Sequence, residues 1–149
     1  MHLVAACGSS AIKPSERDTT GQYDGLWVGR VSEPRASRVE LSGSWYTKCD
    51  WEPFEVRFVV EDGRIRLRRD SRNEFNTPVA GDGRFHLERP GKMATGRIGT
   101  LPGNGKAVYV YTGSLAEDGR EGWYKPYVTS MGTGGCSAKM TLEAFEEGS

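Results

Sequence analysis

Apolar and polar residues alternate along much of this chain, which is typical of β-strands that bury one face. The clearest example covers residues 54–61, which Asp62-Gly63 and residues 64–68 follow. Asp-Gly is the pair favoured in a two-residue type I′ turn. A turn there brings apolar residues opposite one another, so we predict a β-hairpin. The predicted partners are Glu61 and Arg64, Val60 and Ile65, Val59 and Arg66, and Phe58 and Leu67.

The triplet Asp-Gly-Arg recurs at residues 82–84 and 118–120. The unequal spacing is not a solenoid period and indicates repeated use of one turn chemistry. At the first repeat we expect a two-residue turn that pairs Ala80 with Phe85. The flanks of the second repeat alternate poorly, which predicts a longer loop there.

Alternation also predicts one continuous strand over residues 38–45 and a late strand over residues 136–142. Residues 108–111 and 123–128 complete the set, and no segment shows a convincing helical period. Glycine, with 20 residues, is frequent, as in proteins with many turns. We therefore predict an all-β fold, an antiparallel β-barrel or β-sandwich of about eight strands.

The 149 residues fit one domain, and the 20 acidic and 20 basic side chains balance. A dedicated nucleic-acid-binding protein usually carries a basic excess, so we expect no nucleic acid partner. No run approaches the roughly 20 apolar residues of a transmembrane helix. These features fit a water-soluble domain rather than a multi-spanning membrane protein.

The first residues are apolar and small, then abruptly polar. Val4-Ala5-Ala6-Cys7 resembles the bacterial lipobox, which implies a lipid on Cys7 and export to the cell envelope. The resemblance makes residues 1–6 the remainder of a signal peptide. Residues 7–22 then form a lipidated flexible linker, and residues 23–149 form a single β domain. The alternative is a chance apolar start on a cytosolic protein.

With Cys7 lipidated, Cys49 and Cys136 remain as an even pair, 87 residues apart. In an oxidising compartment such a pair predicts one disulfide, whereas the alternative is two buried free thiols. The strand patterns place both cysteines on the inward side. We therefore expect a disulfide that joins an early strand to the last one and closes the fold.

No residue pattern predicts a catalytic, metal or cofactor site. Residues 99–106 fail the spacing of a phosphate loop. The chain has two histidines, His2 and His86, and the pattern sets His86 on the outer face without a partner. Four acidic residues remain candidates for a convergent pair, and nothing distinguishes them: Asp24, Glu52, Asp70 and Glu74. We expect a non-enzymatic protein without a cofactor.

Two groups of residues are candidates for binding. A basic stripe is formed by Arg64, Arg66, Arg68 and Arg69, with Arg57 opposite and Arg72 beyond. It is either a solvated outer face or a contact with an acidic partner such as a lipid headgroup, lipopolysaccharide or acidic protein patch. The aromatic residues are either core or a ligand-binding surface. Among them we single out Trp27, and also Tyr124 and Tyr127, which lie near a glycine-rich loop.

Gly25-Leu26-Trp27 resembles the Gly-x-Trp signature of lipocalins, which implies a barrel that carries a small apolar ligand. The longer segment Tyr23 to Gly29 resembles the opening of small exported proteobacterial domains that pair an early cysteine with a late one. Our leading hypothesis is an envelope lipoprotein, at the outer membrane facing the periplasm, that acts as a binding or accessory subunit for an envelope protein or acidic ligand. The alternative is a lipocalin-like carrier.

Overall fold

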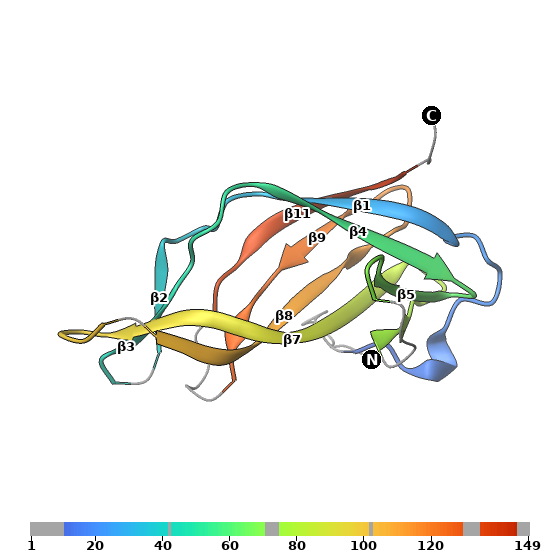
Figure 1. Ribbon diagram of the computed structural model, residues 1–149. Helices are drawn as coiled ribbons and strands as arrows, with labels where there is room; N and C mark the ends of the chain where they lie inside the picture. The colour runs from blue at the N-terminus through green and yellow to red at the C-terminus, as the bar shows by residue number, and fades with distance from the viewer. Residues whose placement is uncertain (1–10, 42, 71–74, 102, 130–134, 146–149) are drawn as a thin grey trace, which may run out of the picture.

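The computed structural model describes residues 11–41, 43–70, 75–101, 103–129 and 135–145 (Figure 1). It confirms the all-β prediction, and every strand pairing is antiparallel. Cys7, the predicted site of lipid attachment, lies outside the described residues, as do Arg72, Glu74 and His2. The strands are β1 (Gly25–Val31), β2 (Arg38–Glu40), β3 (Trp45–Lys48), β4 (Phe54–Glu61), β5 (Arg64–Leu67), β6 (Thr77–Pro78), β7 (Arg84–Arg97), β8 (Gly103–Ser114), β9 (Glu121–Tyr124), β10 (Tyr127–Val128) and β11 (Ala138–Ala144).

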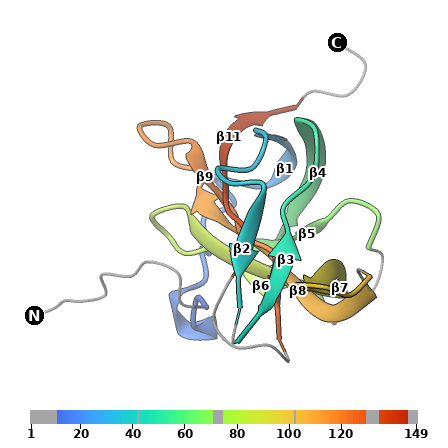
Figure 2. The same ribbon diagram turned by 90° about the vertical axis from the view of Figure 1, so that its left-hand side faces the viewer.

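One sheet contains all of these strands in the order β2-β3-β7-β8-β9-β11-β1-β4-β5-β6, with β10 paired to β8. The late strand β11 lies between β9 and the first strand, β1. The sheet curls strongly but is not closed (Figures 1 and 2). Its last strand, β6, returns toward β7, where one isolated bridge joins Val79 to Phe85.

The concave side of the curled sheet holds the main core, which we define as the larger cluster of buried apolar side chains. Phe58, Ile65 and Phe85 are among its fully buried members. Phe58 contacts both Phe85 and Tyr111, with ring centroids 5.8 and 5.7 Å apart. Burial of so much apolar surface is the main stabilising contribution to this part of the fold.

The predicted hairpin is confirmed in register. Strands β4 and β5 pair Glu61 with Arg64 and Phe58 with Leu67. Asp62 and Gly63 have φ values of 52° and 69°, as a type I′ turn requires at both central residues. The sequence reading succeeds here because turn chemistry and the apolar pattern fix the same register.

Two local predictions are wrong. Residues 38–45 do not form one strand, since β2 and β3 fold into a hairpin that pairs Val39 with Thr47 and turns at Gly43, whose φ is 68°. A glycine in this conformation permits the turn that the alternation hid. At the Asp82-Gly83 repeat, Phe85 bridges Val79 rather than Ala80, because Gly81 also joins the loop. The longer loop expected at Asp118-Gly119 is present between β8 and β9.

Residues 11–22, part of the segment expected to be a linker, contact the domain, and we call them the strap. Ile12 and Asp18 are buried, and a short 3-10 helix covers Pro14–Glu16. The Asp18 N–H donates to the Val79 carbonyl at 2.7 Å, and Arg17 bridges to Ala80. The segment lacks apolar periodicity because it is not a strand of the sheet. Its backbone groups instead form hydrogen bonds with the turns that it covers.

The predicted disulfide joins Cys49 to Cys136, with Cα atoms 5.6 Å apart. It does not lie in the main core. Both cysteines belong to a second cluster of five buried residues, which they form with Met93, Ala107 and Val128. The disulfide therefore links the end of β3 to the segment before β11 and holds the second cluster together, and the sheet itself stays open.

Candidate functional site

The free edge of β4 creates an opening in the wall of the curled sheet. Strand β4 pairs with β1 from Phe54 to Val60, whereas β5 pairs only with residues 58–61. Beyond Leu67 a single hydrogen bond, from the Arg68 N–H to the Arg57 carbonyl, continues the contact. Residues 54–56 are left without a partner strand on that side in the described chain.

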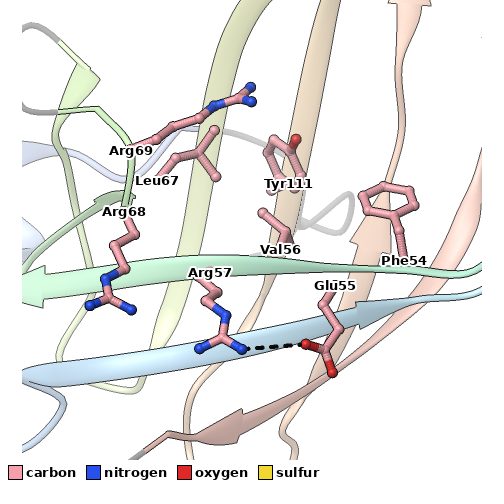
Figure 3. A pocket seen from close by; sticks show the side chains of 8 residues that line it. All are labelled: Phe54, Glu55, Val56, Arg57, Leu67, Arg68, Arg69 and Tyr111. Atoms are coloured by element: carbon pink, nitrogen blue, oxygen red, sulfur yellow. Dashed lines mark ion pairs between the residues drawn. The ribbon is translucent and has the colours of Figure 1, made fainter. Parts of the chain in front are cut away.

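A pocket of about 510 Å³ lies at this opening (Figure 3). Its apolar wall comes from Phe54 and Val56 on β4, Leu67 on β5 and Tyr111 on β8. Its polar residues are Glu55 and three arginines: Arg57, Arg68 and Arg69. An apolar surface bordered by a few charged groups is the usual composition of a small-molecule site. We call it the side pocket.

The side pocket backs onto a cluster of aromatic rings centred on Tyr124. Trp51 and Phe54 meet Tyr124 edge to face at 5.1 and 5.3 Å, and Tyr111 lies 5.2 Å away. Burial raises the pKa of Tyr124 strongly, and the neighbouring tyrosines raise it further. Burial also raises the pKa of Tyr111, although Arg69 and Arg89 oppose the shift. Both phenols are therefore neutral at physiological pH, and the wall is uncharged.

Charge at the side pocket comes from its rim. Glu55 lies 3.6 Å from Arg57 and 3.3 Å from Arg30, so it is shared between two cations. Arg69 is exposed and acts electrostatically on the Tyr111 phenol. In Figure 3 the Arg69 side chain lies on the same side of β4 as Tyr111, whereas the Arg57 side chain lies on the other side, toward Glu55. The three arginines and one glutamate give the rim a positive balance.

The predicted basic stripe divides into residues with different environments. Arg68 and Arg57 line the side pocket. Arg66 instead pairs with Glu61 at 2.8 Å and donates to the Asp70 carbonyl at 2.9 Å. Arg64 is exposed beside Pro78 of β6. The stripe is thus not one continuous binding surface.

The three aromatic candidates are also separated. Trp27 is buried in the main core, donates its indole N–H to the Tyr23 carbonyl at 2.8 Å, and lies in neither pocket described here. Tyr124 is the buried centre of the aromatic cluster. Tyr127 lines a second pocket of about 390 Å³ beside the disulfide, where Arg35 and Lys125 lie 5.3 and 5.6 Å from the Trp123 ring centre.

The residues of the segment Tyr23 to Gly29, which carries the resemblance to small exported domains, make structural contacts. The Asp24 carboxylate accepts hydrogen bonds from the N–H groups of Asp62 and Gly63, at 3.0 and 3.1 Å. A Cβ on Gly29 would lie 2.8 Å from the Met140 sulfur. These residues join β1 to the β4–β5 turn and to β11.

The acidic candidates lie in separate contacts. Asp24 binds the β4–β5 turn, Glu52 is exposed, and Asp70 pairs with Arg89 at 3.0 Å. In the described ranges no three histidine, cysteine or acidic side chains are placed to hold a metal ion. The expectation that His86 faces solvent is wrong: it is buried, and its Nε2 lies 2.6 Å from a Glu88 carboxylate oxygen.

Sequence reasoning missed Phe54 as a pocket residue, and it did not single out Arg69 within the basic stripe or Tyr111 among the aromatic residues. One signal was present, because the first strand of the predicted hairpin is longer than the second and leaves an unpaired end. The position of Tyr111 across from that end depends on the curl of the whole sheet.

Comparisons with protein-family models, with curated proteins and with solved structures found no match. The described residues include no helix of the length and apolar character needed to cross a bilayer. The fold and site define an open, antiparallel β protein with a pocket in its side wall.

Proposed function

We propose that this protein is a non-enzymatic envelope lipoprotein whose side pocket binds an amphiphilic ligand with an anionic group. The observation that carries the proposal is an uncharged apolar wall with the exposed Arg69 on the same side of β4 as Tyr111, and with Arg57 and Arg68 on the rim. The apolar part of such a ligand would pack on Phe54, Val56 and Tyr111. Its carboxylate, sulfate or phosphate would bind guanidinium groups, which match these anions in geometry as well as in charge.

This ligand class differs from that of an enclosed lipocalin-like carrier. The main core is filled by large side chains, among them Phe58, Phe85 and Leu115. Trp27, which a carrier would use to line its cavity, is part of that core. A ligand held in the side pocket keeps one face open to solvent or to a partner, which suits a binding or accessory subunit.

The tether to the membrane is the second part of the proposal. Because the strap packs against the domain from Ile12 onward, only a few residues separate Cys7 from the folded body. A lipid on Cys7 would hold the domain close to the membrane rather than on a long spacer. Intact mass of the protein from its native host tests this part: a diacylated N-terminal cysteine is expected, and an unmodified Cys7 would contradict it.

The ligand is tested by titration of the purified Cys7→Ser chain with a long-chain fatty acid and with the alcohol of the same chain length. Tryptophan fluorescence reports binding, since Trp51 lies in the aromatic cluster behind the wall. We expect the acid to bind at least about tenfold more tightly, the equivalent of about 1.4 kcal/mol.

Arg69→Gln should remove much of that preference, because it removes a pocket cation that is exposed. Arg64→Gln is the matched control, since Arg64 is an exposed arginine outside the pocket. Equal affinity for acid and alcohol, or equal effects of the two substitutions, would contradict the proposed ligand class.

A further inference from the structure

The end of the sheet farthest from the strap carries an unusual arrangement of charge. We define the arm as β2, β3 and the far ends of β7 (residues 92–97) and β8 (residues 103–107). Figure 1 shows the β7–β8 hairpin projecting on the left beyond the other strands, and Figure 2 views the molecule from that end. The strands of the arm hold five cationic residues, Arg38, Lys48, Lys92, Arg97 and Lys106, and one acidic residue, Glu40.

Four of these cations lie in two like-charged pairs. Arg38 is directly opposite Lys48 across β2 and β3, and Lys92 is directly opposite Lys106 across β7 and β8. Directly opposed residues of an antiparallel pair share a face, and like charges in such positions are destabilising. All four side chains are exposed. Each pair therefore carries a repulsion that no ion pair within the arm offsets, although Arg38 also lies 4.7 Å from the centre of the Tyr46 ring.

The two pairs belong to one face of the arm. Strands β3 and β7 pair Tyr46 with Gly96, and side chains alternate along each strand, so Lys48 and Lys92 point to the same side. Glu40, opposite Tyr46, is the acidic residue of this face. None of the four cations forms an ion pair with an acid among the described residues.

The tip of the arm is apolar. Ile98 is 71% exposed and Leu101 is 91% exposed, and they are the exposed large hydrophobic residues of the described chain. The adjacent β2–β3 turn is held to them, since the Ile98 N–H donates to the Ser44 carbonyl at 3.3 Å and Arg97 Nε donates to Ser44 Oγ at 3.1 Å. Trp45 and Leu41, both half-buried, flank the same turn.

We propose that the arm binds an anionic lipid surface, with its cationic face on the headgroups and Ile98 and Leu101 inserted among them. Apolar side chains bordered by lysine and arginine are what the interface of a bilayer accepts from a peripheral protein. The bilayer supplies the negative charge that the like-charged pairs lack. This contact is separate from the side pocket and does not require a lipid on Cys7.

The test uses the Cys7→Ser chain and sedimentation with phosphatidylcholine vesicles that contain or lack phosphatidylglycerol. We expect binding to the anionic vesicles, weakened by added salt. Lys92→Gln with Lys106→Gln should lower the partition coefficient about 30-fold, at about fivefold for each charge. Ile98→Ser with Leu101→Ser should lower it about tenfold or more.

Arg64→Gln with Lys139→Gln is the matched control, because it removes the same charge from exposed positions outside the arm. It should change binding by less than about threefold. Thermal unfolding distinguishes a loss of binding from a loss of folding. If the substitutions remove only the contact with the vesicle, the arm variants unfold at the wild-type temperature. Absence of binding to anionic vesicles, or equal losses in arm and control variants, would overturn the proposal. Binding to soluble polyglutamate but not to vesicles would overturn it in favour of an acidic protein.

Discussion

The main core and the second cluster share one sheet but depend on different forces. The main core joins fifteen buried residues from strands on both sides of the curl, and large apolar side chains fill it. The second cluster joins five, and two of them are the bonded cysteines. A small cluster buries too little apolar surface to be stable on its own, so a covalent link takes the place of burial there. The body of the protein, which contains the main core, is therefore stabilised by packing, whereas the second cluster at the base of the arm depends on its disulfide.

The largest expected effect is at the centre of the main core. Phe58→Ala removes a fully buried ring that contacts Phe85 and Tyr111, and should lower the free energy of unfolding by about 3–5 kcal/mol. Denaturant unfolding followed by fluorescence measures it. A loss below about 1 kcal/mol would mean that the core is looser than described.

The second largest loss of stability is expected on removal of the disulfide. Cys49→Ser with Cys136→Ser should cost about 2–4 kcal/mol, because the link closes a separation of 87 residues. Hydrogen exchange should also become faster at Thr47 and Thr95 in the arm than at Phe58 in the body. A uniform increase across the sheet would contradict the division into two regions.

The contact between strap and body is tested at Gly63. Its φ is 69°, and a Cβ there would lie 2.2 Å from the Asp18 carbonyl oxygen. Gly63→Ala should therefore lower stability by about 1–3 kcal/mol. Gly43→Ala is the matched control, because Gly43 has a φ of 68° and a Cβ there meets nothing within 4 Å. Similar losses at both positions would remove the strap from the explanation.

The strap should also make stability depend on pH. Burial acts to raise the pKa of Asp18, but hydrogen bonds from Thr20 and Gln22 outweigh it and lower that pKa below 3.8. A carboxylate with a lowered pKa contributes stability above its unfolded pKa and loses it as pH falls through the folded pKa. Asp18→Asn should cost about 1 kcal/mol at neutral pH, with the difference from wild type shrinking below about pH 4. A pH-independent difference would contradict this assignment.

The smallest effect is expected in the arm. Arg38→Gln relieves a like-charged pair with Lys48 and should raise stability by a few tenths of a kcal/mol. Arg30→Gln is the comparison in the body, where Arg30 pairs with Glu55 and Glu143 and its loss should lower stability slightly. Differential thermal unfolding of the two variants measures both signs, and a loss at Arg38 would mean that its contact with Tyr46 outweighs the repulsion.

The sequence predicted those parts of the fold where local rules act together. At Asp62-Gly63 the turn pair and the apolar pattern specify one register, and the structure has it. In the segment around Gly43 the apolar alternation predicts one strand, but Gly43 adopts a positive φ and the chain forms a hairpin there. The disulfide was predictable from the number of cysteines, but its place in a second cluster was not, because it depends on how far β7 and β8 extend beyond the body.

The candidate site was predictable only in part. Arg68 was identified as a basic residue of the predicted hairpin, and it does line the side pocket. Tyr111 was one of many aromatic candidates and could not be singled out, since its position depends on pairings that β8 makes with β7 and β9. The strap was missed because burial of Ile12 and Asp18 has no periodicity to reveal it.

The pairing of β1 with β11 has a consequence for how the chain reaches its final form. Residues 25–31 are made early, yet one of their two neighbours is residues 138–144. The central ladder of the sheet therefore cannot form until residues 138–144 have been synthesised, more than 100 residues after β1. Before that point β1 lacks one of its two neighbours, and a chain without its central ladder is the form that can be threaded through a narrow translocon. The proposed export would use that delay.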